Sequence, residues 1–259
     1  MNEIFSWRRL ALLLRNDIMG GYRTLLIHSA ALAVLIVAGS MMNVYFNGAS
    51  LNPIYWFPAL LFIWGPVIAS RAFGELHDKT RNESFLLLPG SSLEKTAARL
   101  LLVTAGFLGF VLAYTTVVSF LAETANLLVF GRQNELFRPF DPLVGVLVGH
   151  YVVAQSLYFL GAAWFRKAHF WKTALATTAI WCGCIAFAVL LGWLLFEPYR
   201  DGFGVSFNEG ELYSIFLGRT PLIDRVGQAA KIAYYFVLPP FCWLVAWLRV
   251  KETQVSYGV

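Results

Sequence analysis

Residues 24–43, TLLIHSAALAVLIVAGSMMN, decide the fold class, because this stretch of 20 residues contains no Asp, Glu, Lys or Arg. A helix of about 20 apolar residues is long enough to cross the hydrocarbon core of a bilayer. Only helices and closed barrels satisfy every backbone polar group in lipid, and barrel strands alternate apolar with polar residues. Residues Ala31–Ala38 do not alternate, so we predict a transmembrane helix here.

Five further uncharged, apolar stretches of similar length follow along the chain, at 54–70, 100–122, 143–165, 173–196 and 232–248. The whole chain is 58% hydrophobic and only 14% charged, which is too apolar for an ordinary soluble domain of this length. The sequence therefore predicts an all-α, polytopic membrane protein. Its six transmembrane helices would occupy residues 24–248, and residues 249–259 would form a cytoplasmic tail.

The first 23 residues predict an amphipathic helix that lies on the membrane surface and precedes the six spans. Apolar residues recur there at three- and four-residue spacing, at Ile4, Trp7, Ala11, Leu14 and Ile18. Three arginines between them supply cations for anionic lipid headgroups. The alternative for residues 1–23 is a basic leader that only sets the topology.

The distribution of Lys and Arg residues predicts the orientation. With the N-terminus in the cytoplasm, the cytoplasmic segments hold 14 Lys and Arg residues and the opposite segments hold 6, although their total lengths are similar, 70 and 65 residues. Because basic residues accumulate in cytoplasmic loops, we predict a multi-pass protein of the plasma (inner) membrane with both termini in the cytoplasm. The basic residues are spread over four segments, which argues against a nucleic-acid partner.

The most informative polar segment is the predicted cytoplasmic loop 71–99, RAFGELHDKTRNESFLLLPGSSLEKTAAR. Its short amphiphilic stretch, 82–88, ends at the helix breaker Pro89-Gly90. Ser91 and Glu94 then match a capping box, which predicts the start of a helix that runs into the third span. A short helix, a stop and a rigid connection would form a lever, since a push on 82–88 would move the third span.

This loop resembles the loop between the second and third spans of ABC-2-type transporter permeases. Those proteins commonly carry an acidic residue after the second span and then a GTLExLLxxP-like segment before the third. The matching residues here are Arg71, Gly74-Glu75, Asn82-Glu83-Ser84-Phe85-Leu86-Leu87-Leu88-Pro89 and Leu93-Glu94-Lys95. Arg81-Asn82 stands where the family usually has Gly-Thr. The six-span layout with a leading amphipathic helix is also similar, so the resemblance covers essentially the whole chain.

The resemblance implies the permease subunit of an ATP-driven transporter that works in export. Each complex would contain two permease chains, identical or homologous, and two ABC ATP-binding subunits. The 82–88 helix would dock on the ATP-binding subunit, and the coupling residues would be Glu75, Asn82, Glu83, Ser84, Phe85 and Pro89. Membrane lipids are the remaining expected partner. The alternative for the same loop is a solvated connection with an ordinary helix cap.

We expect this chain to bind no nucleotide or other cofactor itself, with ATP and Mg²⁺ on the partner subunit. Residues 90–96, GSSLEKT, look like a Walker A loop but lack the Gly before Lys and are one residue short of GxxxxGK[ST]. No GxSxG or HExxH motif occurs, and no spacing of His and Cys predicts a metal site. The chain is therefore not expected to be an enzyme, and it offers no catalytic or metal-ligating residue.

Two polar residues of the fourth span, His150 and Gln155, are candidates for lining a translocation path, because polar groups inside a membrane usually face the bundle interior. Each could equally hydrogen-bond a neighbouring helix. Gly149, which with Gly145 forms a GxxxG pair, permits a close helix contact within the chain. A stand-alone secondary transporter or channel, or a membrane enzyme or scaffold, is the alternative function. Ion coupling, however, needs ionisable groups in the spans, and these hold only His28 and His150.

Overall fold

The computed structural model describes residues 5–77, 90–132, 135–195, 200–201, 204–205 and 221–256. Within these ranges, six helices are long and apolar enough to cross a membrane: Trp7–Asn47, Pro53–Leu76, Ser92–Phe130, Pro142–Trp164, His169–Phe187 and Gly227–Thr253. Each overlaps one of the predicted apolar stretches. The all-α architecture of a polytopic membrane protein is thereby confirmed.

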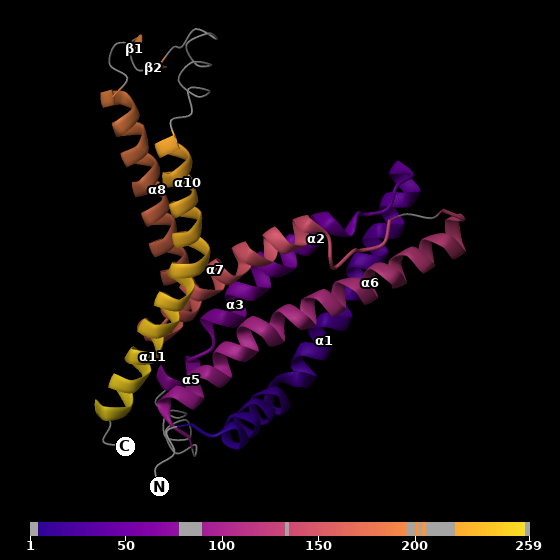
Figure 1. Cartoon of the computed structure of the whole chain (residues 1–259). Coiled ribbons are helices and arrows are strands. Elements are labelled where there is room, and N and C mark those ends of the chain that lie inside the picture. The colour runs from indigo at the N-terminus through magenta and orange to yellow at the C-terminus, as the bar shows by residue number, and fades with distance from the viewer. Residues whose placement is uncertain are drawn as a thin grey trace.

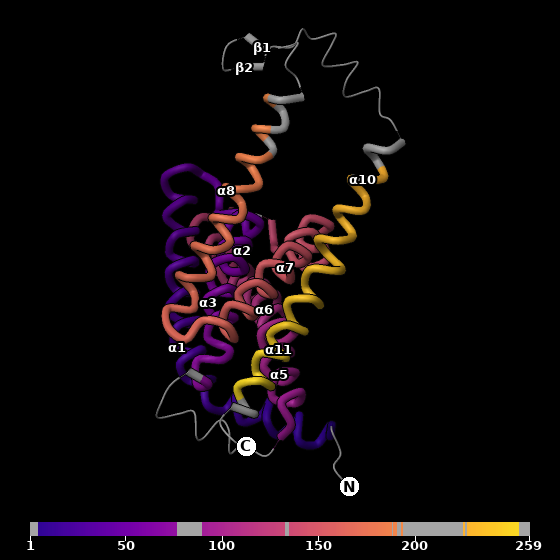
Figure 2. Tube along the Cα trace, turned by 90° about the vertical axis from the view of Figure 1, so that its left-hand side faces the viewer, coloured from indigo at the N-terminus to yellow at the C-terminus, as the bar shows by residue number. Residues whose placement is uncertain are grey.

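The first helix, α1 (Trp7–Asn47), is continuous over 41 residues, so the predicted boundary at residue 23 falls inside it. Its first turns cross the lower end of the bundle before the helix turns upward (Figures 1 and 2). The sequence places Gly20-Gly21 within this helix, and glycine pairs are among the usual causes of a helix bend.

Of the other five spans, the second, third and sixth each contain a π-helical segment, and the fourth and fifth are single α-helices. Their elements are α2 (Pro53–Ala59), η1 (Leu60–Trp64), α3 (Gly65–Ser70) and η2 (Gly74–His77); α5 (Ser92–Leu101), η3 (Leu102–Gly106) and α6 (Phe107–Phe130); α7 (Pro142–Trp164); α8 (His169–Leu195); and α10 (Pro221–Ile232), η5 (Ala233–Val237) and α11 (Leu238–Ser256). The last helix thus begins at Pro221, earlier than the predicted boundary at residue 232. Between α8 and α10, the two-residue strands β1 (Arg200–Asp201) and β2 (Gly204–Val205) pair antiparallel.

The segments η1, η3 and η5 are π-helical, and two of them have a proline as their cause. η1 precedes Pro66 and η5 precedes Pro239. A proline cannot donate to the carbonyl four residues earlier, and its ring would clash with that carbonyl, so the preceding turn widens. η3 has no proline. Instead, the hydroxyl of Tyr151 in α7 donates a hydrogen bond to the carbonyl of Val103 at 2.6 Å. This carbonyl therefore has a hydrogen-bond donor from a neighbouring helix, which is one of the usual causes of a local change in the helical hydrogen bonding.

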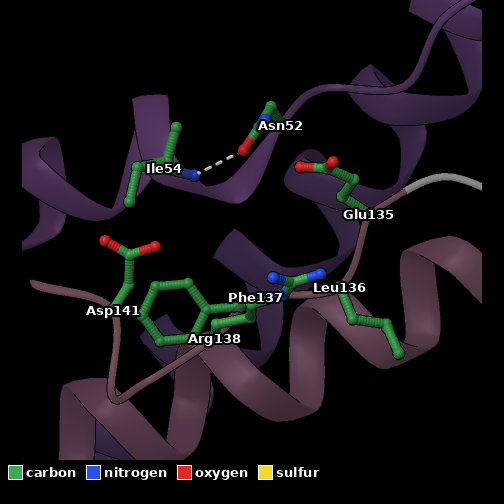
Figure 3. A pocket seen from close by; sticks show the side chains of 7 residues that line it. All are labelled: Asn52, Ile54, Glu135, Leu136, Phe137, Arg138 and Asp141. Carbon is green, nitrogen blue, oxygen red and sulfur yellow. Dashed lines mark hydrogen bonds between the residues drawn. The ribbon is translucent and has the colours of Figure 1, made fainter. Parts of the chain in front are cut away.

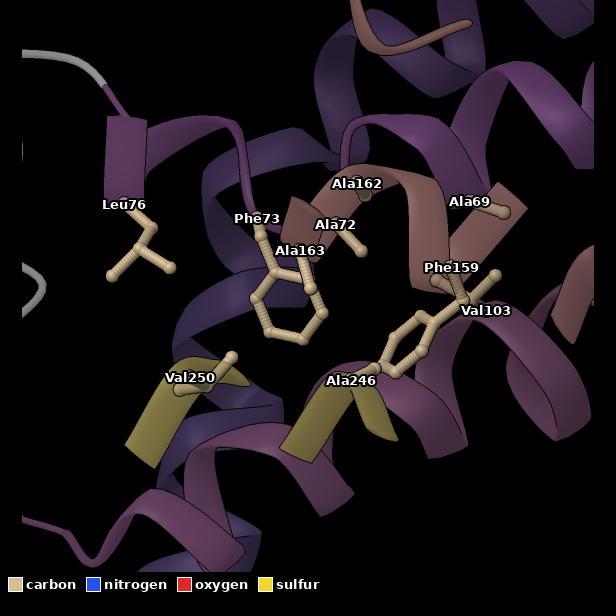
Figure 4. Packing of buried hydrophobic residues seen from close by; sticks show 10 residues of the cluster. All are labelled: Ala69, Ala72, Phe73, Leu76, Val103, Phe159, Ala162, Ala163, Ala246 and Val250. Carbon is tan, nitrogen blue, oxygen red and sulfur yellow. The ribbon is translucent and has the colours of Figure 1, made fainter. Parts of the chain in front are cut away.

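α1 begins and α11 ends at the same end of the bundle, here termed the termini end, and the opposite end is termed the far end (Figure 1). One hydrophobic core is drawn in Figure 4. Its rings Phe73 and Phe159 meet edge to face, with centroids 4.9 Å apart. The remaining members are Ala69, Ala72, Leu76, Val103, Ala162, Ala163, Ala246 and Val250. This core therefore joins the second, third, fourth and sixth spans.

Much of the apolar surface is not covered by the chain itself. Trp181 and Phe187 of α8 are exposed, as are Val34 and Leu35 of α1. α8 and α10 diverge from α6 toward the far end (Figure 1). Apolar side chains that face away from the bundle are the expected arrangement for helices surrounded by lipid, since hydrocarbon is as apolar as the side chains.

Candidate functional site

Two clusters of charge at the termini end flank residues 78–89, the middle of the predicted cytoplasmic loop. In the first cluster, Arg99 of α5 lies between two carboxylates. Its Nε is 2.9 Å from Oδ2 of Asp17 in α1, and its Nη2 is 2.9 Å from Oε2 of Glu75 in η2. Arg99 and Asp17 are largely buried. One guanidinium thus joins three segments that are far apart in the sequence.

The second cluster is built around Glu94, which is fully buried in the first turn of α5. Its carboxylate accepts hydrogen bonds from the backbone N–H of Ser91 at 2.9 Å and from that of Ser6 at 2.6 Å. Nη2 of Arg9 lies 3.1 Å from the same carboxylate. The Ser91 hydroxyl accepts from the Glu94 N–H at 3.2 Å, so the predicted capping box is confirmed. Charged hydrogen bonds from three donors compensate the cost of burying this carboxylate.

Apolar contacts connect the two clusters. Leu10 and Leu13 of α1 are buried against Ala98 of α5. Together with Asp17, they recur at three- and four-residue spacing and therefore form one face of α1. Of the predicted apolar stripe, Leu14 packs against these buried residues, whereas Trp7 is 75% exposed and Ile18 is 53% exposed. The start of α1 thus has one face packed on α5 and an uncovered apolar face.

The clusters tie both flanks of residues 78–89 to α1. Glu75 precedes these residues and reaches α1 through Arg99, whereas Ser91 follows them and reaches α1 through Glu94. Of the six predicted coupling residues, only Glu75 is among the described residues. The other five, Asn82, Glu83, Ser84, Phe85 and Pro89, lie outside the described residues.

Sequence reasoning missed the partners of Glu75 and Glu94. Asp17 and Arg9 are two helical turns apart on α1, and Arg99 and Glu94 are about one and a half turns apart on α5. The cation precedes the anion on α1 and the anion precedes the cation on α5, so opposite charges pair when the two helices run parallel, and this was a signal in the sequence. Which helices would meet, however, was not visible from the spacing.

The two polar residues of the fourth span have different surroundings. His150 is half-buried, with Nδ1 3.3 Å from Oη of Tyr234 and Nε2 3.0 Å from Oη of Tyr235, both in η5. It therefore bonds a neighbouring helix. Gln155 is fully buried, and neither of its amide atoms has a hydrogen-bond partner among the described residues.

A polar pocket of about 170 Å³ lies at the far end (Figure 3) and is lined by Asn52, Ile54, Glu135, Leu136, Phe137, Arg138 and Asp141. Two of its polar side chains cap helices. Asn52 accepts from the Ile54 N–H at 3.0 Å, at the start of α2, and Asp141 accepts from the Leu143 N–H at 2.8 Å, at the start of α7. The backbone N–H of the buried Phe137 donates to the Ser119 hydroxyl at 3.0 Å. Residues 135–141 are thus attached to the middle of α6.

Among the described residues, no group of three His, Cys, Asp or Glu side chains is placed to hold a metal ion. Comparison of the chain with protein-family models, with curated proteins and with solved structures found no match. The resemblance to ABC-2-type permeases therefore rests on the residue order of the loop 71–99 and on the predicted topology.

Proposed function

We propose that this chain is the membrane-spanning permease subunit of an ABC-2-type transporter, working in export and driven by a separate ATP-binding subunit. That subunit docks on the 82–88 helix, on the cytoplasmic side of the plasma (inner) membrane, where the termini end lies in this proposal. The observation that supports the proposal is that the described residues on both sides of the loop are attached to α1, through Glu75–Arg99–Asp17 before it and through Glu94–Arg9 after it.

The attachment gives a mechanical reason for the proposal. A helix is stiff along its axis, and α5, the π-helical turn η3 and α6 form one continuous helical path of 39 residues from Ser92 to Phe130. At 1.5 Å per residue, this path is about 58 Å long. In this proposal, a displacement of 82–88 is carried to the far end by the third span, while the ion pairs move the start of α1 with it.

The start of α1 supports the predicted membrane-surface role in the same scheme. Its uncovered face carries Trp7 and Ile18, and Arg8 and Arg15 are exposed beside them. Apolar side chains flanked by cations suit the boundary between acyl chains and anionic headgroups. In this proposal, the surface helix keeps the lever at a fixed depth in the membrane.

The energy for transport comes from the nucleotide cycle of the partner subunits, which hold ATP and Mg²⁺. A second permease chain, identical or homologous, completes the path. The permease itself needs contacts that differ between two states of the partner, and no chemistry of its own.

Purification of the tagged chain from native membranes in mild detergent tests the proposal. A stoichiometric soluble protein with a Walker A motif is expected to co-purify, and Glu83→Lys is expected to remove it. Lys167→Glu is the matched control, since Lys167 is an exposed cation in the turn between α7 and α8. A chain that purifies without an ATPase while other membrane complexes survive contradicts the proposal and favours the stand-alone transporter.

The path-lining role of His150 is a separate part of the proposal. If His150 contacts the transported molecule, His150→Ala abolishes transport and leaves the ATPase bound. If transport is lost in Glu83→Lys but retained in His150→Ala, the hypothesis that His150 lines the translocation path is wrong.

A further inference from the structure

Three consecutive residues of α7, Gly149 to Tyr151, contact or adjoin all three π-helical segments. Tyr151 is fully buried, and its hydroxyl donates to the Val103 carbonyl of η3 at 2.6 Å. The same ring lies against Gly65, the residue that directly follows η1. A Cβ built on Gly65 would overlap Cε2 of the Tyr151 ring and lie 3.1 Å from its Cδ2. Tyr151 is therefore a fixed anchor between the second and third spans.

The residues before Tyr151 reach the third π-helical segment. His150 bonds the hydroxyls of Tyr234 and Tyr235, at 3.3 Å and 3.0 Å. A neutral imidazole can donate to one hydroxyl and accept from the other. A Cβ on Gly149 would lie 3.1 Å from Cε1 of Tyr235, so the absence of a side chain at residue 149 allows this close approach. We term His150, Tyr234 and Tyr235 the His150 latch.

The packing of the last span changes at η5. On the side of the termini end, Cys242 is 1% exposed, and Ala246 and Val250 are fully buried in contact with the bundle. Within η5, Phe236 is 74% exposed, and on the other side Ile232 of α10 is 57% exposed. Residues 227–233 are all exposed. The last span is thus held by its α11 half, and its α10 half has little packing of its own.

A π-helical turn inside a helix is frequently found at a functional site and is one of the usual positions of a helix kink. Pro239 and Pro240 follow η5 after Leu238 and remove two backbone donors from the next turn. The weakest part of the backbone of the last span therefore coincides with the change in packing and with the latch.

We propose that η5 is a hinge in the last span and that the His150 latch, which ties η5 to α7, fixes the angle at which α10 leaves the bundle (Figure 2). While the latch is closed, α10 keeps the direction seen in Figures 1 and 2. When the latch opens, this angle varies, and α11 stays in place because its buried face packs on the bundle. This inference concerns the motion of the chain itself and does not depend on the proposed ATPase partner.

The test measures one distance on each side of the hinge by double electron–electron resonance, in the full chain reconstituted in lipid nanodiscs. Cys182 and Cys184 are replaced by alanine, and the buried Cys242 is kept. One label pair joins α7 to α10, at Val146→Cys and Ala229→Cys. The control pair, Lys167→Cys and Leu248→Cys, reports the packed half. All four label positions are exposed.

The latch is then opened in two ways, by His150→Ala and by the double variant Tyr234→Phe with Tyr235→Phe. The second variant keeps both aromatic rings and removes only the hydroxyls, so the packing of η5 is retained. In both variants, the distribution of 146–229 distances is expected to broaden, with the 167–248 distances unchanged. Unchanged 146–229 distances in the Tyr variant would overturn the latch. A parallel change in both pairs would overturn the hinge at η5.

Discussion

Tyr151 occupies the space that any side chain at residue 65 would need. A Cβ on Gly65 would overlap the Tyr151 ring and would also lie 3.2 Å from Cε1 of Phe107. The three residues come from the second, fourth and third spans and belong to one buried cluster or border it. Glycine at residue 65 is therefore required by packing, since its backbone lies within an ordinary helical segment.

Gly65→Ala is expected to destabilise the protein by about 1–3 kcal/mol, because an added methyl group in a filled core forces a ring or backbone to shift. The expected readout is a lower midpoint of thermal unfolding in detergent, followed by circular dichroism. Gly109→Ala is the matched control, since a Cβ on Gly109 meets nothing within 4 Å. That variant should unfold at or above the wild-type temperature, because alanine is the better helix former.

Removal of the Glu94 charge is expected to cost about 1–3 kcal/mol, since Glu94→Gln leaves a buried site with more donors than acceptors. The Ser6 and Ser91 N–H groups and the Arg9 guanidinium all point at this carboxylate. Denaturation of the purified variant measures the loss. In Glu252→Gln, the control, the ion pair with Arg249 is exposed, so a change below about 0.5 kcal/mol is expected. Equal effects of the two substitutions would contradict the assignment of Glu94 as the buried centre of the cluster.

The two carboxylates beside Arg99 are expected to contribute unequally. Asp17 is 14% exposed and Glu75 is 41% exposed, and each lies 2.9 Å from the guanidinium. Because water screens the more exposed pair, the coupling free energy of Arg99 with Asp17 should exceed that with Glu75. Two double-mutant cycles with alanine measure both values, and a coupling in the range of about 0.5–3 kcal/mol is expected for residues in contact. A larger value for the Glu75 cycle would show that burial does not determine the strength of this cluster.

The two faces of the start of α1 are expected to differ in their surroundings. A spin label at Ile18→Cys should be accessible to molecular oxygen, which partitions into lipid, because Ile18 lies on the uncovered apolar face. A label at Ala11→Cys, on the same predicted stripe, provides a second reading. The control label at Leu13→Cys should be inaccessible to oxygen and to water-soluble nickel complexes, since Leu13 is 8% exposed against α5. Accessibility of residue 18 to nickel but not to oxygen would place this helix in water.

Local features of the sequence predicted a large part of this structure. Uncharged stretches of sufficient length became helices because lipid offers no partner for backbone groups. The capping box at Ser91 and Glu94 formed as predicted, since its bonds join residues three apart. Proline likewise explains the wide turns before Pro66 and Pro239. In the candidate site, Glu75 was predicted from the resemblance of the loop, and its role stays a prediction, whereas its partners Arg99 and Asp17 were not predicted.

The sequence by itself determined the class of the protein, the number of its spans and the cap of α5, because lipid and local backbone geometry act on each segment separately. Only the tertiary structure decided that Glu94 also accepts a hydrogen bond from the Ser6 N–H and pairs with Arg9. It likewise decided that the Tyr151 hydroxyl donates to the Val103 carbonyl and that His150 hydrogen-bonds Tyr235 of the last span. These contacts join residues 48 to 88 positions apart. Their formation depends on which helices pack together, and the apolar pattern of membrane spans does not specify this, since nearly every face of such helices is apolar.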